Sequence, residues 1–213
     1  MQFDEFLKRM PKLSNLQLLG QEAQFEMAPD ERIRALSEMD IEAKNPRWAG
    51  VMAVFYPNAE GETTLVLILR KTYKGVHSNQ VGFPGGKAET LDQSIKHTAL
   101  RETEEEVGLA QSEIEVVKKL TKLYIPPSNF WVQPFIGYVK ETPRFIKEEA
   151  EVEEILEVSL KQFLDDKSVI TQRIDTSYGT MLDVPAFYLA EHVVWGATAM
   201  MLSEVKWALQ QLD

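Results

Sequence analysis

Apolar residues recur along the chain at two spacings, one typical of helices and one typical of strands. Helical spacing predicts helices over residues 3–10, 30–37, 93–107, 160–164 and 196–212. Apolar and β-branched runs predict strands over residues 48–56, 63–69, 114–124, 130–139, 169–176 and 180–189. Because strands lie on both sides of the helix 93–107 in the sequence, we expect an α/β fold in which that helix packs on one face of a sheet.

The first 44 residues precede the first predicted strand, and we assign them only a structural role. Phe3, Phe6, Leu7 and Met10 share one face of a short amphipathic helix that we expect to end before Pro11. We therefore interpret residues 1–44 as an N-terminal extension that packs on the core, and residues 45–213 as one domain. A chain of 213 residues with 44% apolar content is long enough for one well-buried domain with appendages.

The helix predicted over residues 93–107 carries three glutamates on one stripe. At about 100° per residue, Glu102, Glu105 and Glu106 fall within an arc of roughly 100°, whereas Glu104 points to the opposite side. The same stripe carries residues of the kind that a globular helix turns toward the protein, namely Ile95, Thr98 and Ala99. The three carboxylates should therefore face protein or a cavity instead of open water.

Two interpretations of this acidic stripe stay open on the helix alone. Neighbouring like charges need a counter-charge, and a hard divalent cation such as Mg²⁺ would supply it and bridge to phosphate oxygens. The alternative is a solvated acidic face, which is the usual meaning of a run of glutamates.

The residues around the helix favour the metal. Gly85 and Gly86 follow Pro84 directly, a turn composition that lets the backbone approach a ligand closely. Asp92 stands where an N-cap would start the helix, and Gly108 stands just past its end, where a C′ glycine belongs. Loop, helix and stop signal therefore form one unit.

This unit resembles the Nudix box, whose pattern is G-x(5)-E-x(7)-R-E-U-x-E-E-x-G-U, with U an aliphatic residue. Residues 101–109, with the sequence RETEEEVGL, fit its second half except that Thr103 takes an aliphatic position. In the first half, Gly86 lies fifteen residues before Arg101 where the pattern has fourteen, and Asp92 stands where the pattern has Glu. The same extension occurs in the coenzyme A pyrophosphatase branch of the family, which this chain resembles.

The resemblance implies a Nudix-type α/β/α sandwich with a mixed β-sheet, and hydrolysis of a diphosphate linkage in a nucleoside diphosphate derivative. It implies Mg²⁺ or Mn²⁺ as the cofactor, held by Glu102, Glu105 and Glu106 with the backbone carbonyl of Gly86 as a further ligand. In relatives, the arginine that corresponds to Arg101 pairs with acidic groups and orients the ligands.

The residue that takes a proton from water is not fixed by the sequence. Glu105 is the first choice. The segment 145–157 holds six glutamates, which we interpret as mostly solvent-facing. Glu151 among them is the second choice, because Nudix relatives often take an extra carboxylate from a late loop.

The substrate stays open between three hypotheses. They are coenzyme A or a derivative, cleaved to 3′,5′-ADP and 4′-phosphopantetheine; another nucleotide such as ADP-ribose; and a non-catalytic nucleotide-binding module. The coenzyme A branch is similar in the spacing from Arg70 to the FPGG sequence at 83–86, and it differs at four signature positions, Ile68, Lys71, Gly75 and Asn79. Non-catalytic relatives usually lack box carboxylates, and all three are present here.

A polyanionic substrate needs local positive charge in a chain with a net charge of −10. Arg70, at the end of a predicted strand, is the candidate for the 3′-phosphate of coenzyme A. Phe83 and Tyr73 are candidates for stacking on adenine, although an aromatic residue beside a strand is more often a core residue. Further positive charge is available from Lys71, Lys74 and Lys87.

The composition argues against several other classes of function and of metal site. The net charge argues against binding to nucleic acid or to an anionic membrane surface. With no Cys and only three His, the chain offers no disulfide, no thiolate zinc site and no histidine-rich metal site. It has no apolar run of membrane-spanning length and no signal-peptide core, so a reducing cytoplasm is the simplest compartment. A homodimer is left open.

Overall fold

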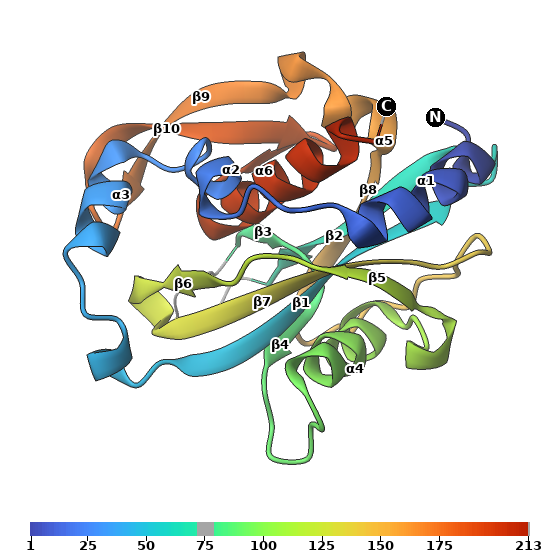
Figure 1. Cartoon of the computed structure of the whole chain (residues 1–213), viewed down its shortest axis with the longest axis horizontal. Helices are drawn as coiled ribbons and strands as arrows, with labels where there is room; N and C mark the ends of the chain where they lie inside the picture. The colour runs from blue at the N-terminus through green and yellow to red at the C-terminus, as the bar shows by residue number, and fades with distance from the viewer. Residues whose placement is uncertain (72–78, 213) are drawn as a thin grey trace.

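The computed structural model of the chain describes residues 1–71 and 79–212. Within these ranges, eight strands form the main sheet: β1 (Arg47–Pro57), β2 (Thr63–Arg70), β3 (Val81–Gly82), β4 (Gly85–Lys87), β5 (Glu115–Lys119), β6 (Leu123–Ile125), β7 (Phe130–Tyr138) and β8 (Val152–Ser159). A second sheet holds β9 (Val169–Thr176), β10 (Gly179–Leu189) and β11 (His192–Val194). The α-helices are α1 (Phe3–Asn15), α2 (Gln21–Phe25), α3 (Asp30–Ser37), α4 (Ile95–Val107), α5 (Leu160–Leu164) and α6 (Gly196–Gln210) (Figure 1). Short 3-10 helices cover Glu42–Lys44, Gln111–Glu113, Pro126–Ser128 and Asp166–Ser168.

The main sheet is mixed, because β1 and β7 run parallel while the other neighbouring strands run antiparallel. The order β3-β2-β1-β7-β5 places β1 at the centre. This strand changes partner along its length, since Phe55 pairs with Leu65 of β2 whereas Val51 pairs with Gly85 of β4. The loop that begins the box-like motif is therefore held against the central strand.

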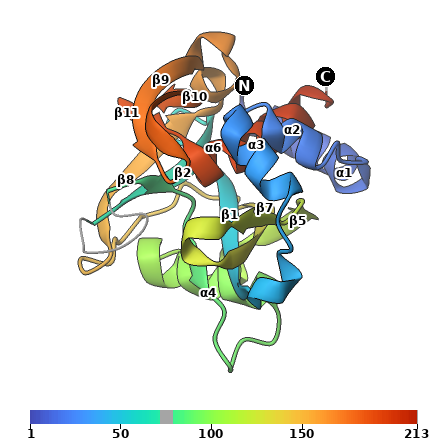
Figure 2. The same ribbon diagram turned by 90° about the vertical axis from the view of Figure 1, so that its left-hand side faces the viewer.

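Alternate residues of β1 point into two separate cores, one on each face of the sheet. Met52 and Val54 join a core cluster with Ala99 of α4. Ala53 and Phe55 join a larger cluster that includes side chains of α1 and α6. Figures 1 and 2 show α4 on one side of the main sheet and α1, α2 and α6 on the other. The predicted α/β/α sandwich with a mixed sheet is confirmed.

The predicted helices are present, with differences at their ends. α3 and α5 have the predicted bounds, whereas α1 runs through Pro11 to Asn15, so the predicted stop before Pro11 is wrong. The helix continues because Leu13, just after the proline, is fully buried in the larger core. None of the helices in residues 1–71 and 79–212 combines the length and the hydropathy that spanning a bilayer requires.

The strand predicted over residues 114–124 is interrupted after Lys119. In the gap between β5 and β6, the N–H of Thr121 donates to the carboxylate oxygens of Glu204 on α6, at 3.1 and 3.2 Å. Gln24 of α2 donates to the same carboxylate and to the Thr121 carbonyl, both at 2.9 Å. The buried carboxylate of Glu204 thus accepts the Thr121 N–H, which in a continuous strand would donate to a neighbouring strand.

The sequence pattern does not predict β8, because its segment is rich in glutamate. Exposed Glu153 and Glu154 mask the burial of Val152, Leu156 and Val158 on this strand. The elements α2, β3, β4 and β11 are too short to show a period. These omissions matter for the site, since β4 holds Gly85 and Gly86, which meet the glutamates of α4.

Candidate active site

α4 packs directly on the central strand at Gly50. A Cβ atom at this position would lie 2.4 Å from the carbonyl oxygen of Ile95 and 3.0 Å from the backbone nitrogen of Ala99. Only glycine permits so close an approach of a helix to a strand. The glutamates of α4 are therefore held at a fixed height above the sheet.

The ends of α4 are set by Ser94 and Gly108. The Ser94 hydroxyl accepts a hydrogen bond from the N–H of His97 at 3.2 Å, so Ser94 is the N-cap and the prediction of Asp92 in that role is wrong. The Asp92 carboxylate instead accepts hydrogen bonds from the side chains of Thr98 and Arg101 within the helix. Gly108 has φ 76°, which confirms the predicted C′ glycine.

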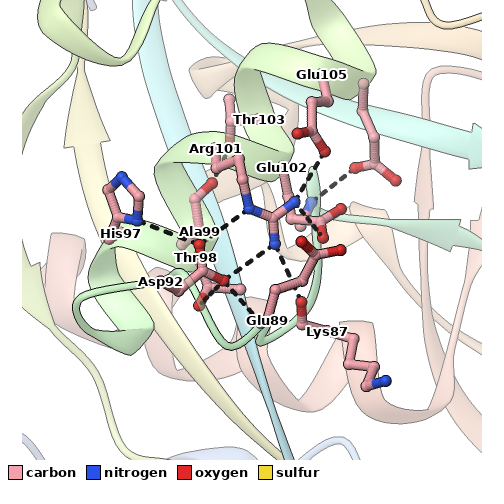
Figure 3. A network of polar contacts seen from close by, with 12 residues as sticks. Lys87, Glu89, Asp92, His97, Thr98, Ala99, Arg101, Glu102, Thr103 and Glu105 are labelled. Atoms are coloured by element: carbon pink, nitrogen blue, oxygen red, sulfur yellow. Dashed lines mark hydrogen bonds and ion pairs between the residues drawn. The ribbon is translucent and has the colours of Figure 1, made fainter.

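Arg101 joins the helix to the loop that precedes it (Figure 3). Its Nε and Nη2 donate to the two carboxylate oxygens of Asp92 at 3.0 and 3.1 Å, and Nη2 also donates to the Lys87 carbonyl at 3.2 Å. Its Nη1 lies 2.9 Å from carboxylate oxygens of both Glu102 and Glu105. These hydrogen bonds from Arg101 hold the pKa of Asp92 well below its usual range. The pairing of Arg101 with acidic groups that the resemblance implies is present.

Glu106 is the most deeply buried carboxylate of the helix, with only 2% of its surface exposed. One carboxylate oxygen accepts a hydrogen bond from the N–H of Gly85 at 2.7 Å. The other has no hydrogen-bond partner and lies 3.4 Å from Nη2 of Arg70. Burial raises the pKa of Glu106 to about 7, although the Arg70 charge and the Gly85 hydrogen bond act against the rise.

Glu102 lies against Gly86 of the loop. A Cβ atom on Gly86 would come within 2.3 Å of a Glu102 carboxylate oxygen, so a side chain there would displace the glutamate. Burial raises the pKa of Glu102, while the charge of Arg101 and its hydrogen bond lower it. The carboxylates of Glu102 and Glu106 thus meet the two loop glycines from the helix side.

Glu105 and Glu151 stand at the edge of this group. The Glu105 side chain is 56% exposed and is held by its ion pair with Arg101. The negative charge of Glu151 raises the pKa of both Glu102 and Glu106, so Glu151 lies within electrostatic reach of both. The sequence-predicted residues of the acidic stripe and its late loop are therefore gathered in one region.

A divalent cation fits this set of groups. Within the described ranges, no three His, Asp or Glu side chains are already arranged as a metal cage. In the structure, these carboxylates form ion pairs with arginines: Glu102 and Glu105 with Arg101, and Glu106 with Arg70. The buried oxygen of Glu106 without a hydrogen bond, and the space that Gly86 leaves beside Glu102, both suit an ion. Carboxylate and carbonyl oxygens are the ligands that Mg²⁺ and Mn²⁺ prefer.

A cavity of about 670 Å³ opens beside the loop glycines. Its wall is made by β1, the loop from Gln80 to Lys87, the turn between β9 and β10, and the start of α6. Among the described residues, four cationic side chains and one carboxylate line it: Arg32, Arg47, Arg70, Lys87 and Asp175. The local charge is thus positive in a chain whose net charge is −10, as a polyanionic ligand requires.

The sequence-predicted binding residues take different places around this cavity. Arg70, Phe83 and Lys87 all line it, together with Gly86. Phe83 is only 2% exposed and belongs to the larger core cluster, which favours its interpretation as a core residue. The remaining candidates Tyr73 and Lys74 fall in residues 72–78, outside the described residues.

Most of the lining residues were not predicted from the sequence, among them Arg32, Tyr178 and Trp195. These three come from α3, from the turn between β9 and β10, and from the residue before α6. No local pattern assigns them to a binding site, because only the packing of distant segments brings them to one wall.

Comparison with known proteins identifies the family. The NUDIX domain profile matches residues 46–174, which is more than half of the chain. The chain belongs to the Nudix family. Nudix hydrolases generally use divalent metal ions, in agreement with the carboxylates and the space at the glycine loop.

Two Nudix relatives illustrate the similarity in sequence. Nudix hydrolase 15, mitochondrial, of Arabidopsis thaliana is 30% identical over 177 residues, which cover 81% of this chain and 61% of the relative. Uncharacterized Nudix hydrolase NudL of Photorhabdus laumondii is 33% identical over 148 residues, which cover 69% of this chain and 78% of the relative. The chain thus matches less than two thirds of the Arabidopsis protein.

Solved structures of Nudix proteins share the fold. RenU, a Nudix hydrolase from M. smegmatis, has a TM-score of 0.54 and 14% identity, over 79% of this chain and 88% of its own. A MutT/nudix family protein from Enterococcus faecalis has a TM-score of 0.52 and 17% identity, over 89% of this chain and 73% of its own. At these identities the likeness concerns the fold alone.

Proposed function

We propose that this Nudix hydrolase cleaves the diphosphate linkage of coenzyme A or a derivative, giving 3′,5′-ADP and 4′-phosphopantetheine. The observation that carries the proposal is that the carboxylate group of α4 and the cavity lie on two sides of Gly86. The carboxylates of α4 meet the loop glycines on one side, and a cavity lined by cationic side chains begins on the other. A diphosphate placed there would lie beside the carboxylates while the rest of the nucleotide occupied the cavity.

Glu102, Glu105 and Glu106, with the carbonyl of Gly86, are the proposed ligands of Mg²⁺ or Mn²⁺. When bound, the ion neutralises charge on the diphosphate and makes a water molecule more acidic. Arg101 would keep its hydrogen bonds to Asp92 and so fix the positions from which the glutamates act.

Glu105 is the proposed acceptor of the water proton, with Glu151 as the alternative. The support for Glu105 is its exposure at the edge of the carboxylate group together with the ion pair that orients it. The support for Glu151 is its electrostatic effect on Glu102 and Glu106. The two variants Glu105→Gln and Glu151→Gln separate these assignments by their effect on turnover.

Arg70 is proposed to contact the substrate close to the diphosphate. Its guanidinium lies 3.4 Å from both a Glu106 carboxylate oxygen and the carbonyl oxygen of Gly85. This position favours a role beside the bond that is cut over the role at the 3′-phosphate that the sequence suggests. Lys87, exposed on the cavity wall, adds positive charge near the same loop.

One structural observation bears on the substrate. Asn79 stands where the coenzyme A branch has glycine, and it has φ 54°, in the left-handed region. Asn adopts this region far more readily than most residues, so the change preserves the backbone turn. The departure of Asn79 from the branch signature therefore counts less against coenzyme A than the changes at Ile68 and Lys71.

A substrate panel tests the proposal. Coenzyme A, acetyl-coenzyme A, ADP-ribose, NADH and diadenosine polyphosphates are incubated with the protein and Mg²⁺ or Mn²⁺, and the products are separated by chromatography. We expect 3′,5′-ADP from coenzyme A, and no product in EDTA. Cleavage of ADP-ribose without cleavage of coenzyme A would support the alternative nucleotide. No turnover of any compound would support a non-catalytic nucleotide-binding module. The cytoplasmic location and the homodimer stay predictions.

A further inference from the structure

Two buried hydrogen-bond donors in the cavity wall have no acceptor. Arg32 is only 5% exposed, and its Nε atom makes no hydrogen bond. The hydroxyl of Tyr178 is also buried and has no hydrogen-bond partner. Both residues line the cavity that begins at the loop glycines. Buried donors are nearly always paired, so two unpaired donors on one cavity wall indicate a place for an acceptor.

The two residues come from segments that pack separately from α4. Arg32 lies on α3, and Tyr178 lies in the turn between β9 and β10; Figure 1 shows α3 and this turn at the same end of the molecule. Nη2 of Arg32 donates to the carbonyl oxygen of Tyr124 at 3.2 Å, which fixes the guanidinium against β6. Its Nε atom is left for a ligand.

The chemistry of this pair favours an anion. No described carboxylate forms an ion pair with Arg32, although a buried guanidinium requires a counter-charge. A guanidinium presents several N–H groups in a fixed planar fork that matches phosphate oxygens. The Tyr178 hydroxyl, which lies within electrostatic reach of Arg32, adds one more donor. A phosphomonoester, which carries two charges and several acceptor oxygens, fits both groups.

We propose that Arg32 and Tyr178 form a subsite for a phosphomonoester of the substrate, separate from the diphosphate that is cut. The proposal rests on the proposed function, and it assigns to the N-terminal extension a part in substrate selection. A substrate with a hydroxyl in place of the phosphate leaves the guanidinium without its counter-charge. The subsite therefore selects against the substrate without the phosphate because that substrate binds more weakly, and no steric clash is needed.

Matched nucleotide pairs test the subsite by kinetics. Coenzyme A is compared with dephospho-coenzyme A, and NADPH with NADH, since each pair differs by one phosphomonoester. For the pair that the enzyme cleaves, we expect kcat/KM to favour the phosphorylated member by about tenfold or more. Tyr178→Phe and Arg32→Gln should each reduce this preference at least threefold, through a larger loss of kcat/KM for the phosphorylated member than for the other. Arg32→Lys should restore part of the preference.

Matched controls separate recognition from stability. Arg34→Gln alters an exposed arginine on the same helix, and Tyr188→Phe removes a hydroxyl from an exposed tyrosine on β10. Both should leave the preference unchanged. Tyr178→Phe removes a single oxygen atom, so it keeps the test valid if Arg32→Gln does not fold.

Binding without turnover gives a second readout. The affinities for 3′,5′-ADP and 5′-AMP are measured by calorimetry on the wild type and on the same variants. We expect a tighter complex with 3′,5′-ADP in the wild type and a smaller ratio in Tyr178→Phe and Arg32→Gln. A smaller ratio of the two affinities in these variants would support the subsite even if no nucleotide in the panel were hydrolysed. In that case only the proposed function would fail. Equal affinity for the two ligands in the wild type, or equal losses for both in the variants, would overturn the subsite.

Discussion

Arginine side chains pair with three carboxylates of α4, those of Glu102, Glu105 and Glu106. Arg101 binds Asp92 with two hydrogen bonds and lies 2.9 Å from both Glu102 and Glu105. Because the Asp92 carboxylate is almost fully enclosed, the guanidinium has one fixed position. The exposed end of Glu105 is thereby held in a defined place although solvent surrounds it. Rigid placement of an exposed carboxylate is what proton transfer requires.

Replacing Glu105 by Gln should lower turnover by about a hundredfold or more, because the change removes the charge of a proposed metal ligand and the proposed proton acceptor. The fold should be retained, since this side chain is 56% exposed. The control is Glu104→Gln. Glu104 is the neighbouring residue, and its carboxylate accepts a hydrogen bond from Gln111 and not from Arg101. Steady-state kinetics on both variants, with circular dichroism, give the comparison. Equal activity in the two variants would remove Glu105 from the site.

The buried carboxylate of Glu106 should make the metal-free protein less stable as pH rises from about 4.5 to about 7. Its pKa is raised from 4.5 to about 7 in the folded state, so the folded protein binds a proton that the unfolded chain releases across this window. The loss is on the order of 3 kcal/mol, since one pKa unit corresponds to about 1.4 kcal/mol.

Glu106→Gln tests this directly, because the amide cannot titrate. Urea unfolding in EDTA at pH 4.5, 6 and 7.5 should show a smaller fall in the free energy of unfolding for the variant than for the wild type. Parallel curves for the two proteins would show that Glu106 has an ordinary pKa.

At the scale of elements, the approach of α4 to β1 depends on Gly50. Gly50→Ala places a methyl group 2.4 Å from a backbone oxygen of α4, so the helix has to move. We expect a loss of about 1 to 3 kcal/mol in the free energy of unfolding, together with lower activity. The stability control is Gly82→Ala, whose Cβ would meet nothing closer than 4.0 Å. Equal unfolding midpoints for the two variants would contradict the close packing.

Local patterns predict those elements whose partners are close in the sequence. The hairpin of β1 and β2, the helix α4 and its C′ glycine follow from spacing and turn residues. The break between β5 and β6 does not, because Glu204 stands 83 residues away from the Thr121 amide that it binds. The box carboxylates were predictable for the same local reason, whereas Arg32 and Tyr178 reach the cavity only through tertiary packing.

At the scale of the whole molecule, α1 contributes to the core of the sandwich. Phe6 is 1% exposed, and its ring lies 5.0 Å from that of Phe55 on the central strand. Phe6→Ala should therefore cost about 3 to 5 kcal/mol in the free energy of unfolding. Lys8→Ala on the same helix should cost less than about 1 kcal/mol, since its pair with Glu5 is exposed. Urea denaturation of both variants measures the difference, and a small effect of Phe6→Ala would mean that α1 does not contribute to the core.

The cavity wall has a consequence for how such proteins diverge. Residues 46–174, which match the family profile, hold the carboxylates and the glycine loop, while Arg32, Tyr178 and Trp195 lie outside that range. Arg70 and Lys87, which also line the cavity, lie inside that range. On the proposed subsite, recognition of the phosphomonoester rests on other stretches of the gene than the hydrolytic chemistry does, so a lineage could exchange the outer stretches and alter this preference while its reaction stays the same. Chimeras that combine the 46–174 segment of one relative with the flanks of another should then inherit the phosphomonoester preference of the flanks.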